Sequence, residues 1–248
     1  MSSSKRASLI KRLQSSFPRE KPLDTRDLTS VGVYPELAYR YVQSGWLERL
    51  GRGMFMFAGD QLQPDRCLEF LGQRIPGFHV GGKTALAWRG LRHNVAFKET
   101  LCLWGPKQSR LPGWFQERFP SRYTTRELFD EKLEAGFALN PLPESPDGVP
   151  VSDPERGLLE MLSEVGVQQG IEEARNIMEL ASHLRMETLH PLLRACRQIK
   201  TIRLCVLWAK ELGLPWADKA WEMVADRIGT SRWVTQLKNG RTLILKPR

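Results

Sequence analysis

The sequence lacks the features of a secreted, metal-binding or membrane-spanning protein. Its cysteines form no Cys-x-x-Cys pair and no zinc spacing with a histidine; they lie at Cys67, Cys102, Cys196 and Cys205. This scatter indicates neither a disulfide framework nor a zinc site, and it suits a reducing cytoplasm. No apolar run approaches the length that crosses a bilayer. Lys11 and Arg12 interrupt any signal-peptide core. We therefore expect a cytoplasmic protein with no membrane segment and no metal.

Groupings of residues that catalyse reactions are also scarce. No two histidines have the spacing of metal ligands; they are His79, His93, His183 and His190. No nucleophile is accompanied by a base and an orienting group, as covalent catalysis requires. The pair Glu172-Glu173 is typical of a solvated helix surface. We predict no catalytic residue, no cofactor and no enzymatic activity.

Basic residues outnumber acidic residues, and the excess is unevenly distributed along the chain. The net charge is +9. Residues 1–57 hold ten Lys or Arg against five Asp or Glu, and residues 186–248 hold twelve against five. Residues 58–185 hold fifteen against eighteen. Positive charge at both ends of the chain favours polyanionic partners or acidic protein surfaces.

The segment from Leu23 to Phe57 is the most informative part of the chain. Asp24 or Thr25 can N-cap a short helix that breaks around Gly32. Pro35 suits the first turn of a second helix, whose buried face is expected to carry Leu37, Tyr41 and Val42. Gly45 ends that helix in the left-handed conformation. The strands Trp46–Leu50 and Met54–Phe57 then form a hairpin. This order predicts a winged helix-turn-helix that binds double-stranded DNA.

Seven residues are predicted to meet the DNA. Five lie on the second helix, away from its buried face, and two arginines lie on the wing, where a flexible cation can follow a phosphate backbone. They are Tyr34, Glu36, Tyr39, Arg40, Gln43, Arg49 and Arg52. Alternatives remain for this segment: a winged helix can bind protein, Tyr39 can pack, and Glu36 can exclude partners as well as accept from a cytosine.

The length of 248 residues suits two domains. Linker composition at Gly59–Pro64 places them at 1–60 and 61–248, with a sub-border near the proline-rich stretch 140–150. In the second domain, short strand-like runs precede five amphipathic helices, the first opened by an expected capping box at Ser152–Glu155, and a terminal hairpin turns at Asn239-Gly240. The predicted fold class is α+β: a winged helix-turn-helix followed by a mixed α/β domain, mainly helical toward its C-terminus.

One motif is misleading. Gly77 to Thr84 matches the phosphate-binding pattern G-x-x-x-x-G-K-S/T letter for letter. A phosphate-binding loop needs an apolar strand before it, whereas Gln73-Arg74-Ile75-Pro76 is typical of a helix end. We interpret Gly81-Gly82 as a tight turn between a strand and a helix, with nucleotide binding through Lys83 and Thr84 as the enzyme-class alternative.

A second basic surface is the other candidate site. Four cations recur at helical spacing: Arg194, Arg197, Lys200 and Arg203. They are predicted either to be solvated or to meet DNA phosphates or an acidic partner.

The motifs LDTRDLTSVGV, YRYVQSGWLERLGRGMFMF, GGKTALAWRGL and VSDPERGLLEML resemble the AbiEi-type antitoxins of abortive-infection toxin–antitoxin systems. The resemblance covers nearly the whole chain, and Gly45–Gly53 and Gly81–Leu86 carry it most specifically. It implies an N-terminal winged-helix domain that represses the antitoxin–toxin operon at inverted repeats in its promoter. It further implies a C-terminal domain, from about residue 61, that counters a nucleotidyltransferase-like toxin, directly or indirectly. Many such recognition helices open with a small capping residue, whereas Tyr34 stands there in this chain.

The resemblance explains Gly-Gly-Lys-Thr without a nucleotide. The alternative function is a stand-alone winged-helix regulator whose C-terminal domain senses a ligand or oligomerises.

Overall fold

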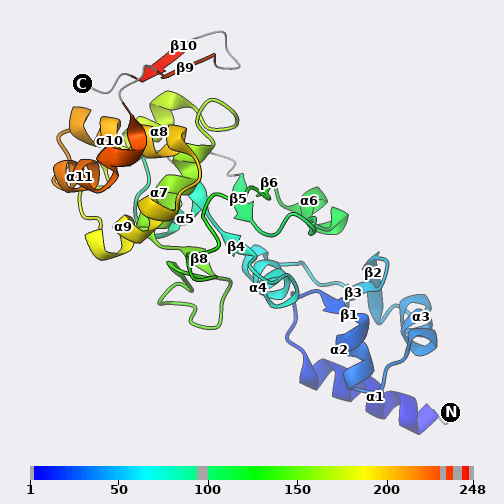
Figure 1. Ribbon diagram of the computed structural model, residues 1–248. Helices are drawn as coiled ribbons and strands as arrows, with labels where there is room; N and C mark the ends of the chain where they lie inside the picture. Colours follow the sequence, from blue (N-terminus) through cyan, green and yellow to red (C-terminus); the bar gives the residue numbers. More distant parts are fainter. Residues whose placement is uncertain (1–2, 94–99, 230–232, 237–241, 246–248) are drawn as a thin grey trace. The chain divides into compact units, whose positions relative to one another are not determined.

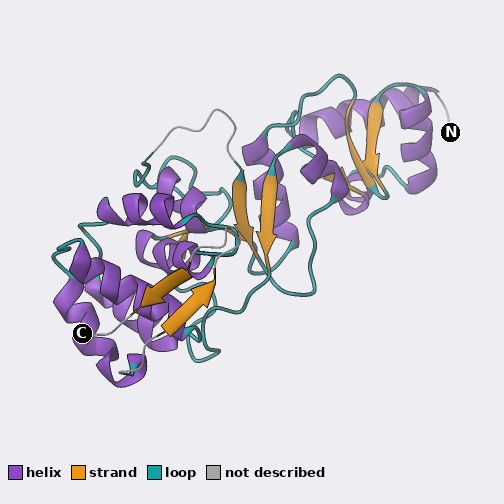
Figure 2. Ribbon diagram, turned by 90° about the horizontal axis from the view of Figure 1, so that it is seen from above, coloured by secondary structure: helices purple, strands orange, loops and turns teal. Residues whose placement is uncertain are grey.

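The computed structural model describes residues 3–93, 100–229, 233–236 and 242–245, and it divides into two compact units. Unit 1 comprises Met1–Arg74 and Leu111–Phe119, and unit 2 comprises Ile75–Arg110 and Pro120–Arg248. The predicted fold class, mixed α and β with a second part that is mainly helical toward its C-terminus, is confirmed (Figures 1 and 2). No helix in the described ranges is long and apolar enough to cross a bilayer.

Unit 1 has the element order of a winged helix. Its elements are α1 (Ser3–Ser16), β1 (Leu23–Asp24), α2 (Thr25–Ser30), α3 (Pro35–Gln43), β2 (Leu47–Gly51), β3 (Met54–Phe57), α4 (Pro64–Arg74) and α6 (Gly113–Arg118). The strands form one antiparallel sheet in the order β1-β3-β2. Leu28 of α2, Leu37 and Tyr41 of α3 and Leu47 of β2 are buried in one core. This core joins α2 and α3 to the sheet, so the helices and the hairpin hold fixed positions within the unit.

Unit 2 begins with a mixed five-stranded sheet in the order β6-β5-β4-β8-β7. Its strands and first helix are β4 (His79–Val80), α5 (Gly82–Trp88), β5 (Leu101–Trp104), β6 (Ser121–Thr124), β7 (Leu139–Asn140) and β8 (Val151–Ser152). β5 pairs with β6, and β4 with β8, in parallel, whereas β4–β5 and β7–β8 are antiparallel. The stretch 140–150, expected as a sub-border, connects two neighbouring strands of this sheet.

In the residues that the structure describes, the rest of unit 2 contains five helices and a hairpin. They are α7 (Pro154–Ser163), α8 (Ile171–Glu179), α9 (Met186–Ala195), α10 (Ile199–Glu211), α11 (Ala217–Ile228), β9 (Trp233–Gln236) and β10 (Thr242–Leu245). β9 and β10 are antiparallel, as predicted, but the expected turn at Asn239-Gly240 lies outside the described residues.

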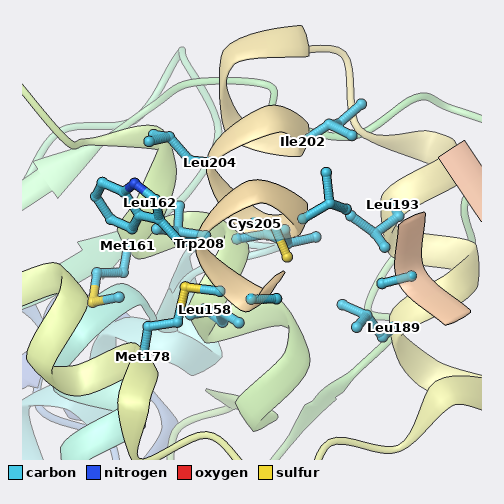
Figure 3. Close-up of a cluster of buried hydrophobic side chains, with 14 of the residues drawn as sticks. Leu158, Met161, Leu162, Met178, Leu189, Leu193, Ile202, Leu204, Cys205 and Trp208 are labelled. Carbon is cyan, nitrogen blue, oxygen red and sulfur yellow. The ribbon is translucent and has the colours of Figure 1, made fainter. Parts of the chain in front are cut away.

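A hydrophobic core holds the helices of unit 2 together. Leu158 of α7, Leu189 of α9 and Cys205 of α10 meet in it (Figure 3). Each fully buried leucine stabilises the fold by about 1.5–3 kcal/mol. α5 crosses α7 at Gly157, where a Cβ would lie 3.4 Å from Cγ of Leu86. A small residue is therefore needed at this crossing.

The expected capping box at the start of α7 is wrong. Asp153 stands at the N-cap, but its side chain makes no capping hydrogen bond. Asp153 instead accepts hydrogen bonds from Asn140 and Arg185, each at 2.9 Å, and Glu155 accepts from Arg185, also at 2.9 Å. The two carboxylates bind charged and amide groups from distant segments, and these bonds replace local capping.

Candidate nucleic-acid interface

The helix α3 has one buried face and one exposed face. Leu37, Ala38 and Tyr41 are buried in the core of unit 1. The opposite face carries the five helix residues predicted to read DNA, and all five are exposed: Tyr34, Glu36, Tyr39, Arg40 and Gln43. Tyr34 and Tyr39 are 63% and 62% exposed, well above the level expected for aromatic side chains that pack internally. The amphipathic pattern read from the sequence is therefore realised.

An ion-paired cap fixes the helix α2 that precedes α3. The Asp24 carboxylate accepts from the backbone N–H groups of Arg26 and Asp27, and the Asp27 side chain accepts from the backbone of Asp24. Arg74, at the end of α4, donates to Asp24 at 2.8 Å and to Asp27 at 2.7 Å. Burial raises the pKa of Asp24, but these hydrogen bonds and the charge of Arg74 outweigh it, so that the pKa lies below its usual value. The sequence indicated the cap but not its link to α4.

The exit from α3 leads directly into a short wing. Gly45 has φ of 73°, the left-handed conformation expected for a helix stop. The hairpin β2–β3 pairs Arg49 with Phe55 and Gly51 with Met54, so Leu50 is an extra residue that forms a bulge. Gly53 closes the turn with φ of 68°, and its carbonyl accepts from the N–H of Thr25 at 3.2 Å. The wing turn therefore lies against the first residue of α2.

The wing arginines are exposed, as predicted. Arg49 donates from Nε to the carbonyl of Gly51 at 3.2 Å, so its side chain folds along the wing strand. Within the described residues, neither Arg40, Arg49 nor Arg52 forms an ion pair with a carboxylate. A cation without a protein counter-charge is available to a phosphate. The structure thus places all seven predicted residues on the surface of unit 1.

Sequence reasoning missed a further exposed cation, Arg26. It stands in the first turn of α2, beside Thr25, which bonds to the wing turn. In helix-turn-helix proteins the helix before the recognition helix crosses the DNA backbone. Its position in the first turn of α2, between the capping residues Asp24 and Asp27, could have identified it.

Two family descriptions match consecutive parts of the chain. Residues 6–97 match the N-terminal domain of a transcriptional regulator described as AbiEi antitoxin. Residues 98–244 match a transcriptional regulator described as AbiEi antitoxin of a type IV toxin–antitoxin system. The chain belongs to the AbiEi antitoxin family. This confirms the resemblance stated from the sequence. Comparison with curated proteins gives no match.

A solved structure has a similar fold. The crystal structure of the RV2827C protein from Mycobacterium tuberculosis aligns with a TM-score of 0.60 over 93% of this chain and 88% of that one. The two sequences are 18% identical, so the likeness concerns the fold alone.

The second basic surface predicted for this AbiEi-family chain does not form. Arg203 is only 5% exposed and donates to the carbonyl of Ile228 at the end of α11. Lys200 is half-buried and donates to the carbonyls of Ser163, at 3.2 Å, and Val165, at 2.6 Å, at the end of α7. Burial and the nearby charge of Arg126 lower the pKa of Lys200. These two cations satisfy the free carbonyls of helix ends, which attract positive charge.

The other two members of that set remain exposed but are ion-paired. Arg194 donates to Asp226 at 2.8 Å, and Arg197 lies 3.1 Å from Glu127 and 3.4 Å from Glu131. Helical spacing predicted one broad face. It failed because a turn at Cys196–Gln198 separates α9 from α10, so the four residues do not share one helix.

The segment that matches a phosphate-binding loop is filled by an internal carboxylate. Glu160 of α7 accepts from the N–H of Gly82 at 3.0 Å, from Ser152 at 2.8 Å and from Arg156 at 2.9 Å. The ring of His79 lies 3.0 Å from the same carboxylate. A Cβ on Gly81 would collide with Glu160 and with Trp104. The carboxylate therefore stands where a phosphate would have to bind.

The ionisation of Glu160 follows from these contacts. Burial raises its pKa, but the His79 ring and the Arg156 guanidinium outweigh burial and lower it to about 2. Lys83, the lysine of the motif, donates to Glu173 of α8 at 2.9 Å. Both groups that could hold a nucleotide phosphate, the loop amide and the lysine, thus bind internal carboxylates. No cluster of metal-ligating side chains occurs in the ranges that the structure describes.

Proposed function

We propose that this antitoxin binds double-stranded DNA in its own promoter, at inverted repeats, and represses the toxin–antitoxin operon. Membership of a family of transcriptional regulators supports DNA binding. The observation that carries the proposal is the exposed face of α3 together with the exposed wing arginines, which form no ion pair with a carboxylate among the described residues. In this arrangement α3 contacts base edges while Arg40, Arg49 and Arg52 neutralise phosphates.

The test is a gel-shift titration with the DNA upstream of the gene, at several salt concentrations. A specific complex whose affinity falls steeply with salt is expected, because neutralised phosphates release counterions. If the upstream DNA binds no better than unrelated DNA at moderate salt, the repressor role is wrong.

We further propose that the chain counters a cognate nucleotidyltransferase-like toxin, directly or indirectly, without catalysing a reaction itself. The family description as a type IV antitoxin supports a toxin partner. Co-expression with the adjacent gene tests this role: growth arrest should be relieved by the full chain, and residues 61–248 alone show whether the DNA-binding part is needed. Persistent arrest with the full chain contradicts the antitoxin role.

The alternative of a stand-alone regulator predicts no toxin gene beside this one, which inspection of the neighbouring reading frame decides. The enzyme-class alternative needs Lys83 to bind a nucleotide. Because Lys83 pairs with Glu173, we expect calorimetry to detect no ATP binding and Lys83→Ala to leave relief of growth arrest unchanged.

A further inference from the structure

A helix that lies between two strands of unit 2 in the sequence belongs to unit 1, the proposed DNA-binding unit. α6 lies between β5 and β6 in the chain, and those two strands pair in parallel in unit 2. The intervening segment Leu111–Phe119 clusters with unit 1 (Figure 1, where α6 is green and the other helices of unit 1 are blue to cyan). The connection between two neighbouring strands of one unit therefore carries a helix of the other.

The contacts of α6 point to the wing. Trp114 and Phe115 are 4% and 0% exposed. A Cβ on Gly51 of β2 would lie 3.9 Å from Cδ1 of Trp114, so the indole lies directly over the backbone of the wing strand. At the C-terminal end of α6, Arg118 lies near Cys67 of α4. Burial raises the pKa of Cys67 to about 12, against the opposing charge of Arg118. α6 thus packs against β2, and its Arg118 brings a positive charge near Cys67 of α4.

Gly51 is the wing residue at which the packing of Trp114 matters. It follows the bulge at Leu50, where the ladder between β2 and β3 is interrupted. Its carbonyl accepts from Arg49, and Arg52 is the next residue in the chain. The indole of Trp114 therefore rests on the residue that stands between the two arginines of the wing. β2 is an edge strand of the three-stranded sheet, and its pairing with β3 is interrupted at Leu50, so packing of Trp114 on Gly51 adds support where the ladder is weakest.

We propose that α6 is a positioning element of the DNA interface, in which Trp114 sets the place of the wing and hence of Arg49 and Arg52. This inference rests on the proposed DNA binding, but how firmly the wing is held in place can be measured without DNA. Trp114 itself touches no DNA; it acts through Gly51. α3 does not depend on it, because the core that buries Leu37 and Tyr41 lacks α6.

The indole offers a conservative variant. Its Nε1 has no hydrogen-bond partner among the described residues, although the atom is buried. A buried N–H without an acceptor is unfavourable, so a phenyl ring can cover Gly51 without that penalty. Trp114→Phe should therefore keep the wing in place, whereas Trp114→Ala should release it.

The first measurement is amide hydrogen exchange of the full chain without DNA. In Trp114→Ala the amides of β2 and β3 should exchange faster, while those of α3 stay protected; Trp114→Phe should match the wild type. The matched control is Trp221→Ala, a half-buried tryptophan of α11 that stacks with Lys210 at 4.4 Å. Unchanged exchange of the wing in Trp114→Ala overturns the proposal.

The second measurement is a double-mutant cycle on the upstream DNA. Trp114→Ala should weaken binding about 10-fold and flatten the salt slope by one to two units, roughly the share of the two wing arginines. In that background Arg52→Ala should add less than about a 2-fold change, whereas Arg40→Ala should keep its full effect, because distant sites are additive. Full additivity of Arg52→Ala with Trp114→Ala contradicts the proposal.

The two measurements separate this inference from the proposed function. If the wild-type protein binds the upstream DNA no better than unrelated DNA, the repressor role fails. The exchange data then still decide whether α6 holds the wing. If the wild type binds specifically and only the cycle fails, the positioning role is overturned and the repressor role stands.

Discussion

Cationic side chains serve two different purposes in this protein. Those on α3 and the wing project from unit 1 without a carboxylate partner among the described residues, and they are available to a polyanion. Arg203 and Lys200, by contrast, bind the carbonyls at helix ends in unit 2. Net charge alone does not distinguish these uses, because both sets count equally toward the total of +9.

At this scale we predict the effect of removing one cation from the interface. Arg40→Ala and Arg52→Ala should each weaken binding to all DNA sequences and flatten the plot of log affinity against log salt by about one unit. Gel shifts at four or more salt concentrations measure the slope. Arg66→Ala is the matched control, because Arg66 is an exposed arginine of α4 in the same unit, 3.7 Å from Glu69. An unchanged slope in Arg52→Ala would mean that the wing contacts no phosphate.

A second residue-scale prediction concerns Glu160. Its folded-state pKa of about 2 lies below the unfolded value of about 4.3. The ionised carboxylate therefore stabilises the fold above about pH 4.3, and this contribution is lost as the pH falls through about 2. At neutral pH, Glu160→Gln should lower the free energy of unfolding by about 3 kcal/mol. Urea unfolding of both proteins between pH 7 and pH 2.5 should show the difference in their free energies of unfolding becoming smaller as the pH falls. A difference that stays constant over this pH range would contradict the lowered pKa of Glu160.

At the scale of elements, helix α3 ends at a glycine in the left-handed conformation. Gly45 adopts φ of 73°, and a Cβ there would meet nothing within 4 Å. Any cost of an alanine is therefore backbone strain alone, about 1–2 kcal/mol. Gly113, in the same unit, has an ordinary φ, and its Cβ would meet only Glu117 at 3.8 Å.

We therefore expect Gly45→Ala to lower the stability of unit 1 and Gly113→Ala, at the start of α6, to leave it unchanged or slightly raised, since alanine favours helix over glycine. Chemical unfolding followed by circular dichroism measures both. Equal stability of the two variants would show that the exit from α3 does not require the left-handed conformation.

At the scale of the whole molecule, unit 1 is discontinuous in sequence. The family boundary at 97/98 separates Met1–Arg74 from Leu111–Phe119, although these segments form one compact unit. The predicted division at residue 60 also excludes α4, whose Arg74 holds the cap of α2. A fragment that follows either linear boundary therefore lacks part of the unit.

This leads to a prediction about fragments. Residues 1–97 should unfold at a lower denaturant concentration than a single chain that joins residues 1–74 to residues 111–119 through a flexible linker, because the first fragment leaves β2 uncovered where Trp114 of α6 packs. Urea unfolding followed by circular dichroism compares them. If the two fragments are equally stable, α6 contributes nothing to unit 1.

The sequence by itself determined the local elements and the family. Capping at Asp24, the stop at Gly45 and the apolar periodicity of α3 depend on near neighbours in the chain, and the structure has them as predicted. The exposed face of α3 follows from the same periodicity. These features were predictable because each is set by interactions within about four residues.

Only the tertiary structure decided which charges are internal and which segments belong together. Glu160 occupies the phosphate-like loop from 78 residues away from Gly82, and Arg74 reaches Asp24 across 50 residues. α6 joins unit 1 although two strands of unit 2 flank it in the chain. Local patterns carry no record of such pairings, because the free energy that selects them comes from burial and ion pairing between segments that meet only once the chain has folded.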